Sequence, residues 1–385
     1  MDMTTPFSDL TTPALLLQRD RLVRNAHDAL ARAHHLGVML RPHFKTAKSV
    51  EVAQLMLGQN MDRMAVSTLP EITMLFAAGI RNIRYTSPFD PTKLNGLQDM
   101  LRAGLELEIL VDDRSAIEAI SNQADRLRVS VGLIVEVDVD GYRAGLPAQG
   151  DVLSSIAKSI TDAPGISFVG LYSFAGQTYR LADRKDRQAL IERHRATLVS
   201  FASALEKQGL PCATLGIGSS PVLADAVHLD GLTEVCAGVY CFQDLTQAGI
   251  GAAQIDDLAV SVLATVTQRK SDDGRIFIDA GGLALSQDRS TRGQSVDQGY
   301  GLVCDALTGR PVGDGDIIVA RTSQEHGVLM RRDGRSAPAE LFPIGRRVRI
   351  LPNHVCMMAA AYPAYTVIDG DKSAERWERA TGWTL

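Results

Sequence analysis

Short apolar runs alternate with helical patterns along the first two thirds of the chain. From Asp20 to Leu36 apolar residues recur at helical spacing, and Gly37 follows as a stop signal. A second helix, from Pro70 to Ala78, has proline in its first turn and a glycine after its end. Further helices are predicted over residues 49–57, 93–103, 115–124, 152–160 and 186–208.

Eight β-rich runs accompany these helices. Each is short, apolar and rich in β-branched residues, which is typical of strands. Eight βα units within roughly 230 residues predict a TIM-type (β/α)8 barrel, an α/β fold closed by its own strands. A doubly wound open sheet is the alternative. The predicted strands are Val38–Leu40, Arg63–Ser67, Ile83–Thr86, Leu107–Val111, Val129–Val137, Ile166–Tyr172, Cys212–Ile217 and Glu234–Cys236.

The pattern changes after residue 255. Short strands with Gly, Asp and Pro turns follow one another there, and few helices fit. We therefore predict a barrel domain over residues 18–252. Residues 253–385, together with the N-terminal segment 1–17, are predicted to form an all-β domain. The N-terminal strand, Thr12–Leu17, could belong to either domain. The predicted C-terminal strands cover residues 260–267, 275–280, 316–320, 327–331, 346–351 and 366–369.

The composition narrows the class of protein. Of 385 residues, 45% are hydrophobic, which suffices for a full core and excludes wholesale disorder. The net charge of −5, without a basic block, argues against nucleic-acid binding. No apolar run approaches the roughly 20 residues of a membrane crossing, and the N-terminus lacks a signal-peptide pattern. Five scattered cysteines do not form a disulfide framework, so a cytoplasmic protein is expected.

A lysine, Lys45, follows the first barrel strand in the segment Arg41–Ser49. The carboxyl ends of the strands form the catalytic face in this architecture. Barrel walls and neighbouring cations can lower the pKa of such a lysine, which could then form an imine or act as a base. A solvated loop lysine is the competing interpretation, and position alone favours it.

Two glycine-containing turns follow the seventh and eighth strands. The first, Gly216–Pro221, leads into a helix, and the second is Ala237–Tyr240. Glycines let the backbone approach an anion, and amides at a helix start donate to it. Because TIM barrels often bind phosphate after strands seven and eight, these turns predict a phosphate site.

A histidine and a cysteine two residues apart, His354 and Cys356, follow a strand of the β domain. On extended backbone, such residues face the same side and could converge on one ion. Imidazole and thiolate together favour zinc, with water or substrate completing the coordination. A packed histidine beside a buried cysteine is the simpler interpretation of an H-x-C pair.

In this order, the segments resemble the fold-type III pyridoxal-phosphate enzymes, in the branch of D-serine dehydratases and D-threonine aldolases. The resemblance covers nearly the whole chain and agrees with the predicted barrel and β domain. Its motifs are Thr12–Ala14, Arg41–Thr46, Val66–Glu71, Asp138–Gly145, Thr233–Tyr240, Asp279–Gly281, Gln324–Gly327 and Pro352–Cys356.

The resemblance implies a role for particular residues. Lys45 matches the lysine that carries pyridoxal phosphate, and it is the candidate catalytic base. Arg143 matches an arginine near the phenolic oxygen of the cofactor, and Tyr179 a tyrosine beside its ring. His354 and Cys356 match the pair that holds a divalent metal, expected to be zinc, manganese or magnesium. The phosphate cradle corresponds to Ser219, Ser220, Gly238 and Tyr240, and Gly218 is grouped with the cofactor-binding residues.

Some positions remain open within this resemblance. Phe174 stands where the family often has histidine, so a ligand contact could be missing or replaced by Gln177. His43 is grouped with the cofactor residues, although a supporting or structural role fits equally well. The same two roles remain open for Asp279, Gln324 and His326.

The implied reaction is β-elimination from a D-3-hydroxy amino acid, which gives a 2-oxo acid and ammonia. D-serine, D-threonine and D-threo-3-hydroxyaspartate are the candidate substrates. The alternative is an aldolase that gives glycine and an aldehyde, but aldolases of the family tend to have His-x-Asp where this chain has His-x-Cys. A racemase would leave the metal pair unused, and a non-catalytic pyridoxal-phosphate-binding protein would lack the β domain. The family also implies a homodimer.

Overall fold

A computed structural model describes residues 7–58, 62–141, 143–270, 272–369 and 372–384. The chain divides into two compact units, which we describe separately. The barrel unit comprises residues 27–238 and 380–385, and the β unit comprises residues 1–26 and 239–379.

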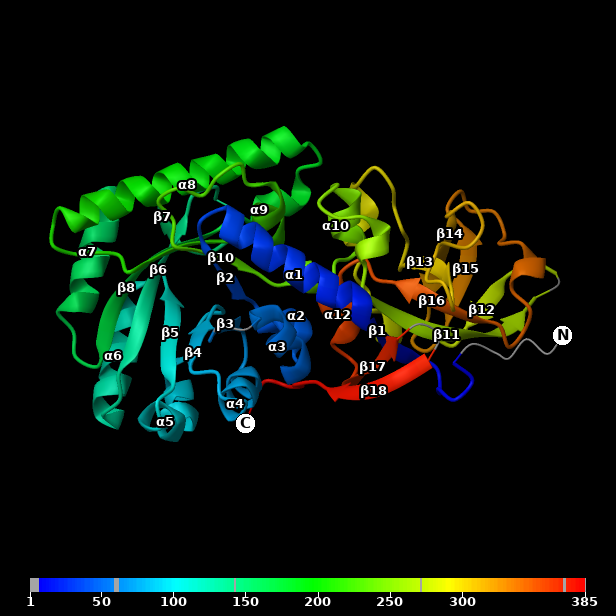
Figure 1. Cartoon of the computed structure of the whole chain (residues 1–385), viewed down its shortest axis with the longest axis horizontal. Helices are drawn as coiled ribbons and strands as arrows, with labels where there is room; N and C mark the ends of the chain where they lie inside the picture. The colour runs from blue at the N-terminus through cyan, green and yellow to red at the C-terminus, as the bar shows by residue number, and fades with distance from the viewer. Residues whose placement is uncertain (1–6, 59–61, 142, 271, 370–371, 385) are drawn as a thin grey trace. The chain divides into compact units, whose positions relative to one another are not determined.

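The barrel unit is built on eight parallel strands in the order β2-β10-β9-β8-β6-β5-β4-β3 (Figure 1). A bridge between His43 and Ala65 joins the two ends of this order and nearly closes the barrel. All eight predicted strands are present, so the TIM-type barrel is confirmed and the open sheet is wrong. The strands are β2 (Met39–Pro42), β3 (Arg63–Val66), β4 (Asn82–Tyr85), β5 (Glu106–Val111), β6 (Val131–Asp138), β8 (Ile166–Phe174), β9 (Thr214–Gly218) and β10 (Glu234–Ala237).

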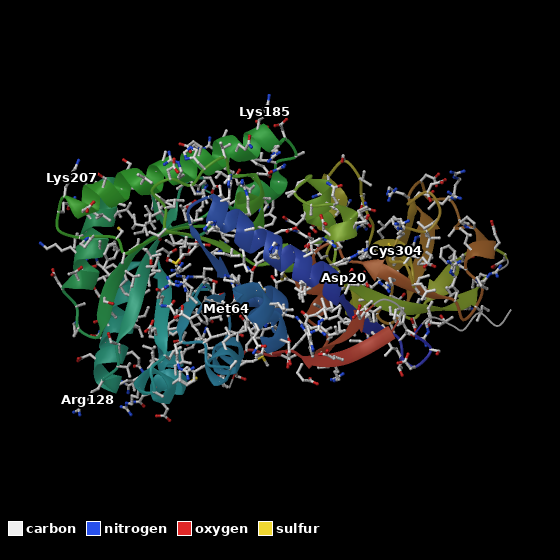
Figure 2. The ribbon with its side chains drawn as sticks, in the orientation of Figure 1. Asp20, Met64, Arg128, Lys185, Lys207 and Cys304 are labelled. Atoms are coloured by element: carbon white, nitrogen blue, oxygen red, sulfur yellow. The ribbon has the colours of Figure 1, made fainter. Side chains whose placement is uncertain are left out.

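Helices follow the strands and cover the outside of the barrel. Lys185 and Lys207, near the two ends of α8 (Arg184–Glu206), point away from the strands (Figure 2). No helix in the described ranges is both long enough and apolar enough to span a membrane. The other elements are α1 (Arg19–His35), α2 (Phe44–Ala47), α3 (Val50–Leu57), α4 (Leu69–Ala77), η1 (Pro91–Lys93), α5 (Leu94–Arg102), α6 (Arg114–Leu127), β7 (Leu146–Pro147), α7 (Gly150–Thr161), η2 (Gly176–Arg180) and α9 (Ser220–Asp225).

The interior of the barrel contains an apolar cluster and a cluster of ion pairs. The apolar cluster consists of Ala65, Leu110, Ile134, Tyr172 and Cys236. The ionic cluster is buried among the strands: Arg41 lies 3.0 Å from Glu234 and 3.3 Å from Glu108, and Arg84 pairs with the same two carboxylates. Burial alone would raise the pKa of Glu234, but the two guanidinium groups lower it to about 2. Glu234 therefore stays ionised inside the barrel.

The β unit contains one sheet in the order β12-β15-β14-β13-β16-β11-β1-β17-β18. β11 also pairs with β12, which closes six of the strands into an antiparallel barrel. The bounds are β1 (Ala14–Gln18), β11 (Val260–Arg269), β12 (Ile276–Ile278), β13 (Leu302–Asp305), β14 (Ile317–Thr322), β15 (Gly327–Arg331), β16 (Arg347–Leu351), β17 (Ala364–Asp369) and β18 (Lys372–Glu378). The helical elements are η3 (Val239–Cys241), α10 (Leu245–Gly249), η4 (Ile255–Asp257), α11 (Gly282–Leu285), η5 (Ser290–Gly293), η6 (Ala339–Leu341) and α12 (Val355–Ala359).

Residues 239–252 lie in the β unit, whereas the sequence placed them at the end of the barrel domain. The reason is the packing of α10. Its first amides donate to the carbonyls of Pro352 and Asn353, and Leu245 is buried among Leu258, Leu302 and Leu351. The N-terminal strand also belongs to this unit, because β1 pairs with β11 and β17. Cofactor binding by one domain and metal binding by the other remain predictions.

Candidate active site

Most of the predicted cofactor residues lie just beyond the carboxyl ends of barrel strands. Lys45 follows β2, Arg143 follows β6 and Tyr179 lies in η2 after β8. Gly218 ends β9, and Gly238 follows β10. Because the strands are parallel, these residues share one rim of the barrel, as expected for a catalytic face.

Lys45 lies in α2, a one-turn helix where the sequence predicted a loop. His43 caps this helix, since its Nδ1 accepts the Lys45 backbone N–H at 3.3 Å. The Lys45 side chain is partly buried. Within the described ranges, the structure gives its Nζ no hydrogen bond or ion pair. Lys45 is thus a partly buried residue of a short helix, and its role as the cofactor lysine stays a prediction.

Lys48 is the other lysine of this segment. Its Nζ lies 2.9 Å from Oε1 of Glu71, a fully buried carboxylate in α4. The second oxygen of Glu71 accepts the backbone N–H of Ser67 at 2.9 Å. The ammonium of Lys48 is thus held by a carboxylate, which leaves Lys45 as the candidate to bind a cofactor covalently.

His43 is buried and neutral. Because Nδ1 accepts a hydrogen bond, Nε2 carries the proton and donates to Thr86 Oγ1 at 2.8 Å. Thr86 Oγ1 in turn donates to the Val66 carbonyl at 3.0 Å. Burial, together with Lys45, Arg143 and Lys48, lowers the pKa of His43 well below its usual range. His43 therefore supports α2 from β2, which agrees with the structural role left open above.

Arg143 lies on a loop that folds back over the end of β6. The carboxylate of Asp138 accepts the N–H of Gly141 at 2.8 Å, and that of Asp112 accepts the N–H of Gly145 at 2.9 Å. The guanidinium of Arg143 lies 4.3 Å from the centre of the Phe174 ring. Phe174, where the family often has histidine, thus provides a cation–π contact for Arg143.

Gln177, the residue that could take the place of the histidine, lies in η2. Its Nε2 donates to the carbonyl of Asp140 at 2.9 Å, so it connects η2 to the Arg143 loop. The same loop is held from outside by His194, a buried residue of α8 that the sequence analysis did not single out. His194 Nε2 lies 3.4 Å from Asp140 Oδ2, and Nδ1 lies 2.9 Å from Ser173 Oγ.

Asp140, His194 and Ser173 resemble a catalytic triad only in composition. Ser173 Oγ donates its proton to the Val137 carbonyl at 2.7 Å, so it accepts a hydrogen bond from His194 instead of donating one. Ser173 and His194 are both fully buried. Burial lowers the pKa of His194 despite Asp140. The three residues therefore position the loop, and no local sequence signal distinguishes His194 from other core residues.

The turn after β9 forms a polar cradle. Ser219 has φ of +151°, and its Oγ accepts the N–H of Val222 at 3.2 Å as the cap of α9. The same Oγ lies 2.9 Å from Thr178 Oγ1. Tyr179 reaches this turn, because its hydroxyl accepts the N–H of Ser220 at 3.1 Å. The structure thus brings together three of the predicted cofactor residues.

Gly218 and Gly238 lie where neighbouring atoms approach the backbone too closely for a Cβ. A Cβ on Gly238 would lie 2.8 Å from Thr46 Oγ1 and 3.1 Å from the His43 carbonyl. A Cβ on Gly218 would lie 1.8 Å from the Tyr172 hydroxyl. A close backbone approach, hydroxyl groups and an amine at the same rim fit a ligand with a phosphate and an aldehyde.

The predicted metal pair lies in the β unit. His354 precedes α12 and Cys356 belongs to its first turn, so the pair does not lie on extended backbone as expected. The two side chains nevertheless meet in a hydrogen bond. Burial alone would lower the pKa of His354, but Cys356, Asp244 and Asp288 raise it to about 9. Imidazole and thiolate in contact fit a zinc-type ion.

Asp244 positions the His354–Cys356 pair, but both of its carboxylate oxygens already accept backbone hydrogen bonds. Its Oδ1 accepts the N–H of Gln247 at 3.0 Å, and its Oδ2 accepts the N–H of Val355 at 3.2 Å. Burial raises the pKa of Asp244 to about 6, against the attraction of His354. Among the described residues, no cluster of three or more His, Cys, Asp or Glu side chains is arranged to hold a metal. The Asp-x-x-Gln spacing, typical of a helix start, was the signal that could have found Asp244.

Asn353 connects the metal pair to the loop before β13. Its Nδ2 donates to the carbonyls of Asp288 and Gly299, and its Oδ1 accepts the hydroxyl of Thr291.

The other predicted residues of the β unit have separate surroundings. Tyr240 is buried in η3. Asp279 is structural, since its carboxylate accepts the Thr12 hydroxyl at 2.5 Å and the Thr265 N–H at 2.8 Å. Gln324 donates to Glu325 at 3.1 Å, and the ring of His326 contacts that of Phe277.

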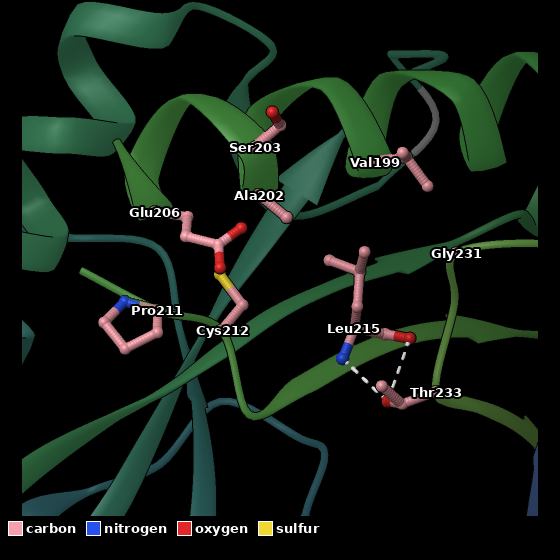
Figure 3. A pocket seen from close by; sticks show the side chains of 9 residues that line it. All are labelled: Val199, Ala202, Ser203, Glu206, Pro211, Cys212, Leu215, Gly231 and Thr233. Atoms are coloured by element: carbon pink, nitrogen blue, oxygen red, sulfur yellow. Dashed lines mark hydrogen bonds between the residues drawn. The ribbon is translucent and has the colours of Figure 1, made fainter. Parts of the chain in front are cut away.

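A pocket of about 280 Å³ lies at the amino ends of β9 and β10, at the end of the barrel opposite the rim that carries Lys45 (Figure 3). It contains one carboxylate, that of Glu206, beside the thiol of Cys212. Burial and Glu206 raise the pKa of Cys212 to about 11, so the thiol is protonated at neutral pH. The Cys212 thiol in this pocket is therefore not an activated nucleophile.

Two family models and several known proteins match this chain. Residues 17–245 match the family described as "Alanine racemase, N-terminal domain", and residues 259–368 match the "Putative serine dehydratase domain". The chain is 41% identical to D-threo-3-hydroxyaspartate dehydratase of Delftia sp., over 97% of this chain and 98% of that protein. It is 27% identical to D-serine dehydratase of Dictyostelium discoideum, over 94% and 95% of the two chains.

Related structures and activities extend this comparison. A mutant of D-threo-3-hydroxyaspartate dehydratase, solved in the metal-free form, superimposes with a TM-score of 0.93 at 40% identity, over 97% of this chain and 98% of that chain. D-threonine aldolase of Arthrobacter sp. is 27% identical, over 97% and 93% of the two chains. The predicted fold class and the predicted lyase class are confirmed. This chain belongs to the fold-type III pyridoxal-phosphate enzymes, in the family of D-serine and D-threo-3-hydroxyaspartate dehydratases and D-threonine aldolases.

Proposed function

We propose that this protein dehydrates a D-3-hydroxy amino acid, with D-threo-3-hydroxyaspartate as the preferred substrate. The products would be a 2-oxo acid and ammonia. The 41% identity to a dehydratase named for that substrate, across nearly the full length of both chains, supports the choice over D-serine. The reaction would require pyridoxal phosphate and one divalent metal ion.

The contact between His354 and Cys356 is the observation that carries the proposal. A thiolate beside an imidazole selects a borderline-soft ion, and zinc is therefore the metal we propose ahead of manganese or magnesium. A Lewis acid assists loss of a hydroxyl group, which is otherwise a poor leaving group. The cysteine also matches the dehydratase pattern, because aldolases of the family tend to have aspartate at that position.

The barrel residues would hold pyridoxal phosphate in a defined orientation. Ser219, Ser220 and Gly238 would hold its phosphate, Tyr179 would lie beside its ring, and Arg143 would contact its phenolic oxygen. The resemblance adds Gly218 to the cofactor residues and Tyr240, a residue of the β unit, to those that hold the phosphate. When bound, this cofactor withdraws electrons from Cα of the amino acid. Nζ of Lys45 would accept the proton from Cα, since Lys48 is paired with Glu71. His43 would keep α2, and thus Lys45, in place.

The aldolase reaction is the second candidate, because D-threonine aldolase shares 27% identity over 97% of this chain. Both reactions would use the metal on the β-hydroxyl group. They differ in the bond that breaks: Cβ–O in the dehydratase and Cα–Cβ in the aldolase. We also propose, from the family, that the protein is a cytoplasmic homodimer.

Product analysis tests the proposal directly. Purified protein, loaded with pyridoxal phosphate and zinc, is given D-threo-3-hydroxyaspartate, D-serine and D-threonine separately. We expect 2-oxo acid and ammonia in equal amounts, with the highest kcat/KM for hydroxyaspartate. Glycine and an aldehyde would establish the aldolase instead, and the absence of any product from all three would contradict both candidates.

A further inference from the structure

A buried carboxyl group with no part in this mechanism lies near the carboxyl end of β6. Glu136 is 6% exposed. It is two residues from Ile134, which belongs to the interior apolar cluster, so it faces the inside of the barrel. Residues at this end of a barrel strand are the ones that carry chemistry in the fold.

Arg143 is the cation that faces Glu136. Nη2 of Arg143 lies 4.0 Å from Oε1 of Glu136, beyond hydrogen-bond distance. Oε1 is buried and has no hydrogen-bond partner within the described ranges. On its other side, the Arg143 guanidinium contacts the Phe174 ring. The arginine therefore lies between a ring and a carboxyl group, with half of its side chain exposed.

The charged and titratable groups around Glu136 come from each neighbouring segment. Asp112 follows β5, Asp138 ends β6, Tyr172 lies on β8 and Arg143 lies on the loop. Burial and the two aspartates raise the pKa of Glu136 to about 7, although Arg143 opposes the shift. The carboxyl group is thus partly ionised at neutral pH.

We propose that Glu136 is a positioning residue that holds the Arg143 guanidinium against Phe174 for contact with the cofactor. The inference rests on the proposed function, because Arg143 is taken to bind pyridoxal phosphate. Ionised Glu136 attracts Arg143 and restricts its side chain before the cofactor binds. Preorganisation of this kind improves affinity because less conformational entropy is lost on binding. Protonated Glu136 lacks this attraction, so the effect should depend on pH.

The first test measures cofactor affinity. The wild type and Glu136→Gln are titrated with pyridoxal phosphate at pH 6 and pH 8, and the dissociation constants are compared at each pH. The cofactor and its own titration are the same in both proteins, so the ratio isolates Glu136. We expect a ratio near one at pH 6 and a roughly threefold to tenfold weaker variant at pH 8. Glu206→Gln, which removes an exposed carboxylate at the other end of the barrel, should change neither value.

The second test needs no cofactor. Phenylglyoxal labels arginine side chains in the cofactor-free protein, and peptide mass spectrometry measures the rate at Arg143 relative to exposed Arg126. Glu136→Gln should label Arg143 faster than the wild type at pH 8, and at the same rate at pH 6. A structural defect would change labelling at both pH values.

Two outcomes would overturn the inference. One is equal cofactor affinity and equal Arg143 labelling in the wild type and Glu136→Gln at pH 8. The other is a loss of affinity by Glu136→Gln that persists in an Arg143→Met background, since Glu136 would then act without the arginine. Failure of the wild type to bind pyridoxal phosphate would contradict the proposed function itself, and the first titration reveals it separately.

Discussion

At the scale of single residues, the choice between two lysines depends on one ion pair. Lys45 and Lys48 lie on the same short segment, and either could form a bond with a cofactor on chemical grounds alone. The ammonium group of Lys48 is paired with the buried Glu71, so Lys45 is the lysine that could react with a cofactor.

Replacing Lys45 tests this assignment. Lys45→Ala should eliminate the visible absorbance of lysine-bound pyridoxal phosphate and lower kcat at least roughly a hundredfold, the lower range for a positioned proton acceptor. Lys48→Ala is the matched control, and its absorbance band should persist. Absorbance spectra and borohydride trapping followed by peptide mapping provide the measurement. A band retained by Lys45→Ala and lost by Lys48→Ala would reverse the two roles.

At the scale of elements, the turn after β10 depends on a close backbone approach. Gly238→Ala should weaken pyridoxal phosphate binding about tenfold, because overpacking of this size costs about 1–3 kcal/mol. The added methyl group would meet Thr46 at 2.8 Å. The dissociation constant, measured by titration, should change more than kcat at saturating cofactor. As the control, Gly293→Ala in η5 adds a methyl group with no atom within 4 Å and should leave affinity unchanged.

The ionic cluster inside the barrel makes a separate prediction about stability. Arg84→Met leaves the buried Glu234 and the partly buried Glu108 with one cation fewer, which should lower the free energy of unfolding by about 3–5 kcal/mol. Urea denaturation followed by circular dichroism measures the change. Arg126→Met, on the exposed surface of α6, should stay within about 0.5 kcal/mol of the wild type. Equal stability of Arg84→Met and the wild type would mean that the cluster contributes nothing.

Glu234 also determines how this cluster responds to acid. Its folded pKa of about 2 lies below the value of about 4.3 expected in the unfolded chain. The stabilisation is therefore complete above pH 4.3 and declines as the pH falls towards 2. The free energy of unfolding of the wild type should decrease across this interval, and that of Glu234→Gln should decrease less. Parallel acid titrations by circular dichroism would reveal the difference.

At the scale of the whole molecule, the two kinds of chemistry belong to different units. Lys45 and its neighbours lie in the barrel unit, whereas His354 and Cys356 lie in the β unit. Each group is held by contacts within its own unit, such as His43 with α2 and Asp244 with α12. We therefore expect cofactor binding to survive loss of the metal.

Chelation tests this separation. EDTA treatment, His354→Ala or Cys356→Ala should abolish dehydration and leave the absorbance of lysine-bound cofactor in place. β-Chloro-D-alanine should remain a substrate, because chloride leaves without a Lewis acid. Cys356→Asp should retain metal binding with a shift towards manganese. Metal analysis and 2-oxo acid assays check these outcomes, and full dehydration by metal-free protein would falsify the role of the pair.

Much of the architecture could be predicted because strands and helices repeat at local periods. All eight barrel strands were found, since buried parallel strands are apolar runs that need no knowledge of their neighbours. β13 and β18 were not predicted. β18 lies at the edge of its sheet and has a mostly charged or polar sequence, so it contains no apolar run that would mark it as a strand.

The sequence by itself determined the fold class, the placement of Lys45 after the first barrel strand and the pairing of His354 with Cys356. These depend on local periodicity and on residues close together in the chain. Only the tertiary structure decided which groups far apart in sequence meet: Lys48 with Glu71, Asp244 with Val355, and Arg84 with Glu234. The same holds for Glu136 and Arg143, whose contact depends on the loop folding back. The reason is that the burial and pairing of a charge depend on which strands become neighbours when the barrel closes. A local sequence pattern does not specify those neighbours.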